Sequence, residues 1–402
     1  MNTTDRQAQV ISFLRLPLVV LVLFVHSNFH GISTAWDALW VSSTNHIGPQ
    51  LPTLGAIIDF LSGSLALLAN PFFFFISGLL FFREGLFTKE LYIHKLQRRV
   101  FSLLIPYLFW NLTYLFLLSL GEGLLPNWTA IIDTPIEQFG FKDWLLAFWD
   151  ISKINNQGGL TAPVVLPFWF IRDLMVLCVA TPLIYKLIDA IAKFKIQVAV
   201  LLFLGLLLAS KWVDDLPGLS FQGFLFFSFG AYFSIKQIKI TEVMPRFQWF
   251  ALFFVIFAWQ QEFMNIAYAG LIIFVVSITT RYLNHRQNQG KITQPIPEIL
   301  TNATFFVFAF HTIVQGGIIF LFKQGILSPH NALEGAVLYL LSPLTMLIVS
   351  VAIHYVLDKL SPRIMTIFCG GVKANPTTFI FHFTEQILQI AYFRMQNRLF
   401  CI

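Results

Sequence analysis

Long apolar runs separated by short polar segments repeat along the whole chain. A helix needs about 20 apolar residues to cross the hydrocarbon core of a membrane, and most of these runs reach or approach that length. The pattern predicts an all-α fold, a polytopic transmembrane helix bundle of about ten spans. The predicted spans are residues 9–28, 55–82, 99–120, 166–187, 196–212, 220–236, 247–261, 264–282, 299–322 and 335–357.

The second predicted span is longer than one crossing requires and contains Pro71. Proline removes a helical hydrogen bond and clashes with the preceding turn. We therefore expect this helix to kink at Pro71, or to begin there as an interfacial piece.

Basic residues are distributed unevenly between the two sides of this predicted bundle. With the N-terminus inside, most of the 26 Lys and Arg residues fall in inner segments, and Arg15 and Arg172 fall within spans. Because cytoplasmic loops carry the excess of Lys and Arg, the pattern predicts that both termini are cytoplasmic. The outer segments hold Lys142, Lys153, Lys211 and Lys323.

The first span has an alternative interpretation as a cleaved secretory signal, because Arg6 precedes an apolar run. A signal sequence rarely carries an arginine and a histidine within that run, so we favour a retained span.

Composition agrees with a membrane protein and excludes other classes. Hydrophobic residues make up 57% of the chain and charged residues 11%, whereas soluble domains carry roughly 25% charged residues. The net charge of +6 comes from short loops, not from one basic face, so no nucleic-acid partner is predicted. Cys178, Cys369 and Cys401 lack metal-site spacing, so neither a disulfide framework nor a metal site is predicted.

Two regions lie outside the spans. Residues 1–370 are predicted to form one membrane-embedded domain, and residues 371–402 a cytoplasmic tail that lies along the inner membrane surface as an amphipathic helix. The largest outer loop, residues 121–165, combines carboxylates with tryptophans. It is either a carbohydrate-binding surface or an interfacial helix anchored by Trp side chains.

Arg15 and His26 are the leading candidates for chemistry inside the membrane. Ten apolar residues separate them, and at 100° and 1.5 Å per residue both project from one helix face, roughly 16 Å apart along the axis. We expect that they face a shared internal cavity. Imidazole suits removal of a hydroxyl proton, and guanidinium suits an anionic phosphate. Alternatively, Arg15 reaches the inner headgroups and His26 the outer interface.

Three other ionisable residues within predicted spans are further candidates. Arg172 and Asp173 lie near the outer end of the fourth span and could pair locally for structure alone. Neighbouring helix residues point about 100° apart, so we favour contacts of each with other helices. His311 follows a Phe-rich run in mid-span and either makes an interhelical hydrogen bond or belongs to a catalytic site.

Four segments of the chain form an ordered set of motifs. They are the Arg15–His26 pair, the aromatic run Pro71–Leu80 with Ser77 and Gly78 near its end, the basic start of the third span with Arg99 and Pro106–Tyr107, and Phe168–Leu174 with the sequence Phe-Trp-Phe-Ile-Arg-Asp-Leu. Together with the Phe-rich approach to His311, this order resembles the acyltransferase 3 family of integral-membrane O-acyltransferases. The resemblance covers residues from about 8 to 370.

The resemblance implies transfer of an acetyl or other short acyl group from acyl-CoA to a sugar hydroxyl of a cell-surface or lipid-linked glycan, at the bacterial inner membrane. No permanently bound cofactor and no particular oligomeric state are implied. His26 would act as base or take the acyl group itself. The implied catalytic residues are His26, Arg15 and Arg172, the donor-binding residues Arg15, Ser77, Gly78 and Arg99, and the acceptor-binding residues Trp169, Asp173 and His311.

Two other functions fit some of these features. A transporter or flippase of lipid-linked glycan also has many spans, intramembrane charges and a broken helix, but it commonly shows paired repeats, and the chain has no convincing internal repeat. A helix-packing or sensory protein would leave the intramembrane Arg and His side chains without a role. The sequence therefore favours an enzyme.

Overall fold

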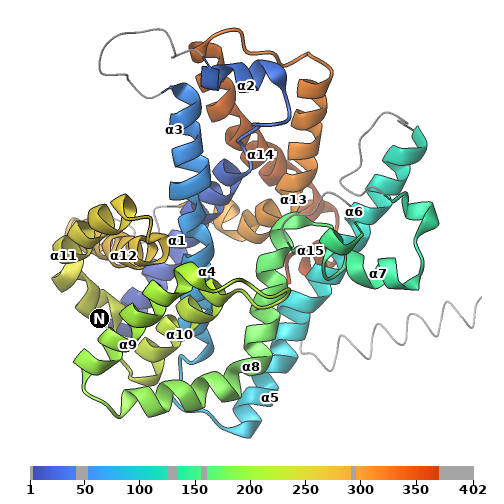
Figure 1. The fold of residues 1–402 in the computed structure, drawn as a ribbon. Helices are drawn as coiled ribbons and strands as arrows, with labels where there is room; N and C mark the ends of the chain where they lie inside the picture. Colours follow the sequence, from blue (N-terminus) through green and yellow to red (C-terminus); the bar gives the residue numbers. More distant parts are fainter. Residues whose placement is uncertain (1–2, 42–52, 125–133, 155–160, 291–295, 371–402) are drawn as a thin grey trace, which may run out of the picture.

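The computed structural model describes residues 3–41, 53–124, 134–154, 161–290 and 296–370, which form helices throughout (Figure 1). No β-strand is present in these ranges. The α-helices are α1 (Thr3–Val25), α2 (Thr34–Val41), α3 (Leu54–Phe60), α4 (Ala69–Phe81), α5 (Lys89–Arg99), α6 (Ile105–Leu124), α7 (Phe141–Ala147), α8 (Trp169–Ala192), α9 (Ile196–Ala209), α10 (Phe221–Ile235), α11 (Ile240–Gln260), α12 (Met264–Asn288), α13 (Glu298–Lys323), α14 (Ala332–Leu360) and α15 (Pro362–Cys369).

Eight helical segments within the described ranges are long and apolar enough to cross a membrane, and two more are apolar but shorter. Each predicted span overlaps one of them, so the polytopic helix bundle is confirmed, while the number of crossings stays a prediction. The long segments are Arg6–Val25, Leu54–Phe81, Lys89–Leu124, Leu166–Ala192, Ile240–Gln260, Met264–Asn288, Glu298–Lys323 and Ala332–Leu360, and the shorter ones Ile196–Trp212 and Phe221–Ile235.

Two of the long segments contain wide or tight turns between their α-helical parts. A π-helical turn, Leu61–Leu65, and a 3-10 turn, Ala66–Leu68, join α3 to α4, and a π-helical turn, Val100–Leu104, joins α5 to α6. The remaining 3-10 turns lie outside the spans or at their ends. They are Ile136–Gln138, Ile151–Lys153, Leu166–Phe168 and Ser210–Trp212.

The second membrane helix departs from α-helical geometry directly before the α-helix that contains Pro71, and the kink itself stays a prediction. Pro71 is the third residue of α4, where a missing N–H is tolerated because the first helical N–H groups lack intrahelical partners. The proline ring clashes with the carbonyl four residues earlier, at Leu67. The chain adapts by tightening into the 3-10 turn Ala66–Leu68 just before α4.

Segments predicted to lie on the same side of the membrane meet in the structure. Near the start of α1, Gln7 Oε1 accepts a hydrogen bond from the backbone N–H of Ile240, which begins α11 (3.3 Å). After α9, Lys211 Nζ donates to the Gln261 carbonyl, which follows α11 (3.4 Å). These contacts agree with the predicted grouping of loops, and the side that faces the cytoplasm stays a prediction.

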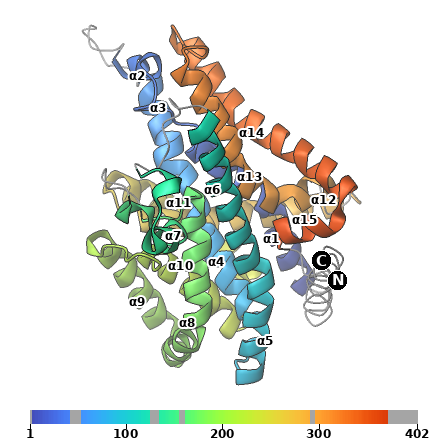
Figure 2. The same cartoon turned by 90° about the vertical axis from the view of Figure 1, so that its right-hand side faces the viewer.

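Helix α1 lies inside the bundle, against α4, α12, α13 and α14, and Figure 2 shows α13 and α14 crossing beside it. Helices α4 and α10 pack most closely. A Cβ atom at Gly78 would overlap the Phe227 carbonyl oxygen, and one at Gly230 would overlap the Phe75 carbonyl oxygen. Small residues allow such close approach of two membrane helices.

The predicted cytoplasmic tail, residues 371–402, lies outside the described residues. Parts of the largest outer loop, residues 125–133 and 155–160, lie outside them as well. The described part of this loop forms α7 and two short 3-10 turns, and Phe141 and Trp144 of α7 are exposed.

Candidate active site

Arg15 lies within α1 and His26 directly after it, in different surroundings. The Arg15 side chain is exposed and makes no hydrogen bond or ion pair with any described residue, whereas His26, directly after α1, is half-buried. Between them along the chain, Val19 and Val22 are 2% and 5% exposed. The two valines therefore pack α1 against its neighbours between the two polar groups, and the cavity expected to be shared by Arg15 and His26 stays a prediction.

The backbone around His26 is held from two sides. The His26 N–H donates to the Val22 carbonyl (3.3 Å), which extends the helical turn past α1. Gln315 Nε2, on α13, donates to the His26 carbonyl (3.0 Å). Two residues before His26, the Phe24 carbonyl accepts a hydrogen bond from Ser62 Oγ in the π-helical turn (2.7 Å). The end of α1 is thus fixed by elements that are remote in sequence.

His311 lies beside His26, with ring centroids 5.0 Å apart and planes inclined by 47°. His311 is fully buried in the middle of α13. Its Nδ1 lies 2.8 Å from the Phe308 carbonyl and 3.2 Å from the Val307 carbonyl. Since carbonyl oxygens only accept, Nδ1 carries the hydrogen of the neutral ring. Nε2 then has a free lone pair, and no described residue bonds to it.

An aromatic layer separates this histidine pair from the start of α8. The rings of Phe308 and Phe168 are parallel within 4°, with centroids 5.8 Å apart, and Phe308 also contacts the His311 ring at 6.3 Å. Trp169, the first residue of α8, packs against Phe74 of α4. His311 contacts Phe308, whereas Trp169 contacts Phe74, so the described ring contacts do not bring the two predicted acceptor-binding residues together.

Arg172 and Asp173 form a buried cluster, 1% and 2% exposed. Arg172 Nε donates to Asp173 Oδ1 (2.9 Å), Nη1 donates to the Trp149 carbonyl, and Nη2 donates to the Thr161 carbonyl (3.1 Å). Asp173 Oδ2 accepts from the backbone N–H of Ser220, just before α10 (2.9 Å). The cluster ties α8 to the outer loop and to α10.

This cluster corrects one part of the sequence interpretation. The two side chains do pair with each other, because the long Arg172 side chain bends back to its neighbour despite the 100° between them. Asp173 also contacts the start of α10, as expected, whereas the further hydrogen bonds of Arg172 go to carbonyls of the outer loop and not to another helix. A catalytic role for Arg172 stays a prediction, and its three carbonyl and carboxylate bonds favour a positioning role.

The predicted donor-binding residues lie on α4 and α5. Ser77 is half-buried beside Gly78 in the α4–α10 contact. Arg99 ends α5, is half-buried and lies near the Cys178 thiol of α8. Neither Arg99 nor Arg15 has a hydrogen-bond partner among the described residues, so both guanidinium groups are available to an anionic ligand.

Sequence reasoning missed Gln315 and the pair of hydroxyls that hold the end of α1. Gln315 follows His311 by four residues, one helical turn on the same face, and this spacing was the available signal. Ser62 and Tyr339, with hydroxyl oxygens 2.9 Å apart, are 277 residues apart in the chain, so no local pattern predicts their contact.

Comparison with known proteins supports the family suggested by the motifs. The family described as "Acyltransferase domain" matches residues 10–357. The chain is similar to the succinoglycan biosynthesis protein ExoH of Rhizobium meliloti (strain 1021), with 26% identity over 246 residues that cover 59% of this chain and 56% of that protein. The chain therefore spans just over half the length of that relative. No solved structure matches the chain. From its motifs, its helical membrane fold and the match across most of its length, this chain belongs to the acyltransferase 3 family.

Proposed function

We propose that the chain is a membrane O-acyltransferase that moves an acetyl or other short acyl group from acyl-CoA to a sugar hydroxyl of a surface or lipid-linked glycan. Its family supports acyl transfer, and the name of its relative, a succinoglycan biosynthesis protein, supports a glycan acceptor. The carrying observation is the His26–His311 pair, in which one ring is oriented by backbone carbonyls and keeps a free nitrogen.

In this proposal His26 is the base. During the reaction the His26 ring turns so that one N–H donates to His311 Nε2, which has no partner among the described residues in this structure. The other His26 nitrogen then accepts the proton of the acceptor hydroxyl. The hydroxyl oxygen attacks the thioester carbonyl carbon, the C–S bond breaks, and the departing thiolate takes the proton from His26. General base help of this kind contributes ~10²–10⁴-fold to the rate.

The donor enters from the side on which Arg15 lies. Arg15 and Arg99 attract the anionic phosphates of CoA, and Ser77 and Gly78 line its path. Along α1, Arg15 and His26 are roughly 16 Å apart, so an extended pantetheine arm carries the thioester from the phosphates towards His26. Since Val19 and Val22 are buried between them, this arm passes beside α1 and not over these two valines. The enzyme would act in the bacterial inner membrane.

The test is transfer of labelled acetyl from acetyl-CoA into glycolipid by inverted vesicles that contain the wild-type chain or His26→Ala. We expect label in the glycolipid with the wild-type chain and a loss of ~10²–10⁴-fold with His26→Ala. His30→Ala, an exposed histidine beyond α1, is the matched control and should keep the wild-type rate. Unlabelled glycolipid that crosses the membrane would instead support the transporter alternative, and equal rates for His26→Ala and wild type would refute His26 as the base.

A further inference from the structure

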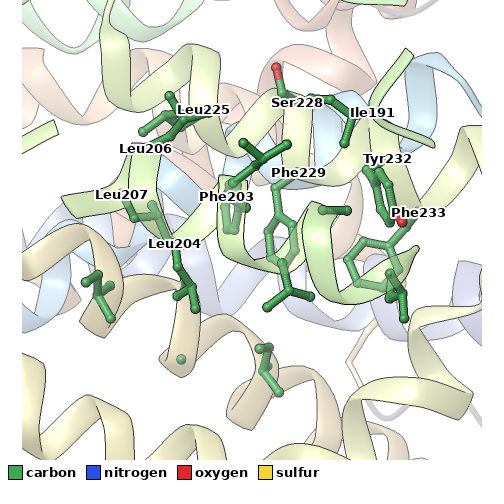
Figure 3. Close-up of a pocket in the computed structure, with 18 of the residues that line it drawn as sticks. Ile191, Phe203, Leu204, Leu206, Leu207, Leu225, Ser228, Phe229, Tyr232 and Phe233 are labelled. Atoms are coloured by element: carbon green, nitrogen blue, oxygen red, sulfur yellow. The ribbon is translucent and has the colours of Figure 1, made fainter. Parts of the chain in front are cut away.

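A cavity of about 700 Å³ lies between α8, α9, α10, α11 and α12, away from the histidine pair (Figure 3). Its wall is almost entirely hydrocarbon. The Phe203 and Phe229 rings, stacked with centroids 4.4 Å apart, form part of it between α9 and α10. Such a volume lies within the range of about 300–1,000 Å³ typical of ligand pockets, and the wall chemistry selects an apolar ligand.

The cavity opens sideways, towards the space that lipid occupies. Its most exposed lining residues lie on α9 and α11, including Val200 at 49%, Phe247 at 53% and Phe250 at 64%. Along α9 the lining runs from Ile196 to Leu207, about 16 Å of helix. One leaflet of the hydrocarbon core is about 15 Å thick, so the cavity has the length of one lipid chain in one leaflet.

Two uncompensated positive charges lie at one end of this cavity. Lys195 directly precedes the lining residue Ile196 and has no hydrogen bond or ion pair with any described residue. Lys236 Nζ, after α10, donates to the Ala192 carbonyl at the end of α8, a neutral partner that leaves its charge in place. The N-terminus of α9 adds backbone N–H groups without intrahelical partners. Together these groups suit a phosphate.

Two hydroxyl groups without hydrogen-bond partners among the described residues are a second observation that points to a ligand in the cavity. Ser228 Oγ and the Tyr232 hydroxyl, both on lining residues, have no hydrogen-bond partner among the described residues, and Ser228 is 8% exposed. Unpartnered buried polar groups are costly. The ester oxygens near the head of a phospholipid chain are acceptors that such hydroxyls would bind.

We propose that the cavity binds one chain of an anionic phospholipid, whose phosphate lies against Lys195, Lys236 and the start of α9. The acyl chain of the lipid fills the space between α9 and α11. This space remains open because α9 and α10 form the two shortest of the described apolar helical segments. This site is independent of the acyltransfer reaction and of the residues assigned to it.

Native mass spectrometry of the whole chain in detergent tests the site, with phosphatidylglycerol or phosphatidylcholine of identical chains added in turn. We expect one tightly held phosphatidylglycerol on the wild-type chain and weaker retention of phosphatidylcholine. Lys195→Gln and Lys236→Gln should each reduce this preference about fivefold, or ~1 kcal/mol per lysine near the membrane surface. The double variant should bind both lipids equally.

A cavity-filling variant tests the hydrocarbon part. Ala199→Phe places a ring in the cavity and should abolish retention of the tightly held lipid, whereas Ala209→Phe, on an exposed position of the same helix outside the lining, should leave it unchanged. Equal retention of the two lipids by the wild-type chain, or unchanged retention by Ala199→Phe, would overturn the proposal. Should Ala199→Phe not fold, the lysine variants decide, because both substitutions are on the surface.

Discussion

The Arg172–Asp173 cluster and the His26–His311 pair are built in opposite ways. In the Arg172–Asp173 cluster each guanidinium nitrogen and both carboxylate oxygens have partners. At His311 only Nδ1 is bonded, and Nε2 faces no partner among the described residues although the residue is fully buried. A saturated cluster stabilises the fold, whereas an unsatisfied group costs folding free energy and marks chemistry.

This difference in hydrogen-bond partners distinguishes two residues that look alike in the sequence. Arg172 and His311 are both intramembrane ionisable residues near family motifs, and the composition around each is aromatic. Partner saturation separates them. The arginine cluster joins α8 to the outer loop and to α10, so it positions these elements. His311 keeps an unpartnered nitrogen beside His26, as the proposed proton transfer requires.

The largest expected effect is on stability, from breaking the saturated cluster. Arg172→Met removes all three guanidinium bonds and leaves the Asp173 carboxylate buried without its cation. Loss of one partner of a buried ion pair costs ~3–5 kcal/mol. Thermal unfolding in detergent, followed by circular dichroism, should show a correspondingly lower midpoint.

Arg281→Met is the matched control for that variant. Arg281 is exposed on α12 and makes one long hydrogen bond, 3.4 Å, to the Pro245 carbonyl. We expect its midpoint to stay close to the wild-type value, since surface substitutions change stability by less than ~0.5 kcal/mol. An equal, small change in both variants would show that the cluster is not structural.

The fold was predictable from the sequence to the extent that it depends on local composition. Each membrane helix coincides with an apolar run, and the tight packing at Gly78 follows from the absence of a side chain. The sequence pointed to Pro71, whereas the irregular turns lie before it, because a proline disturbs the residues that precede it. Ser62, in the π-helical turn, bonds to the Phe24 carbonyl, a contact that no local pattern predicts.

The second prediction concerns the unsatisfied cluster, where activity should fall without loss of stability. His311→Phe fills the same space but removes Nε2, so the His26 ring loses the acceptor that orients it. We expect acyl transfer to slow about 10–100-fold, the size of one or two charge-assisted hydrogen bonds. The free energy of unfolding should change by less than ~1 kcal/mol, since Nε2 has no partner among the described residues in the resting structure.

Two conservative variants separate orientation from packing at this position. His311→Gln places an amide oxygen near the position of Nε2 and should keep more activity than His311→Asn, whose shorter side chain ends near Nδ1. Equal activities of the Gln, Asn and Phe variants would mean that His311 only fills space. The label-transfer rate in vesicles is the measurement.

The site was less predictable than the fold because its contacts join remote parts of the chain. His26 and His311 are 285 positions apart, and their ring contact depends on how α1 packs against α13. The Arg15–His26 spacing predicts one shared face, but it carries no information on the burial of Val19 and Val22 between them. Two of the three hydrogen bonds of the Arg172 guanidinium likewise go to outer-loop carbonyls, at Trp149 and Thr161, which belong to none of the motifs.

A third prediction tests the support of the histidine pair. Tyr339→Phe removes the hydroxyl that contacts Ser62 Oγ but leaves the Ser62 bond to the Phe24 carbonyl. The loss of one such hydrogen bond costs ~1 kcal/mol, so the midpoint should fall slightly and the activity should change little. Tyr355→Phe, exposed on the same helix, should have no effect on either. A Tyr339→Phe rate as low as that of His311→Phe would extend the active site to Tyr339.

The smallest effect on stability is expected at the solvent-exposed ion pair between Glu84 and Lys95, which can be compared with the buried Arg172–Asp173 pair. Glu84 contacts Lys95 Nζ. Burial alone raises the pKa of the Glu84 carboxyl, but the Lys95 bond and charge outweigh it, and the pKa is lowered overall. The pair therefore contributes stability above the unfolded-state pKa of ~4.3, and this contribution is lost as the pH falls through the lower pKa of the folded state.

Glu84→Gln measures this contribution by its difference from the wild-type chain across that pH range. Because Glu84 is 51% exposed, solvent screens the pair, and the difference at pH 7 should be below ~1 kcal/mol. Salt should reduce it further, whereas the Arg172–Asp173 cluster, shielded from water, should show no such salt dependence. A Glu84→Gln effect that is insensitive to salt and as large as that of Arg172→Met would contradict this comparison. It would mean that exposure to water does not distinguish weak from strong ion pairs in this bundle.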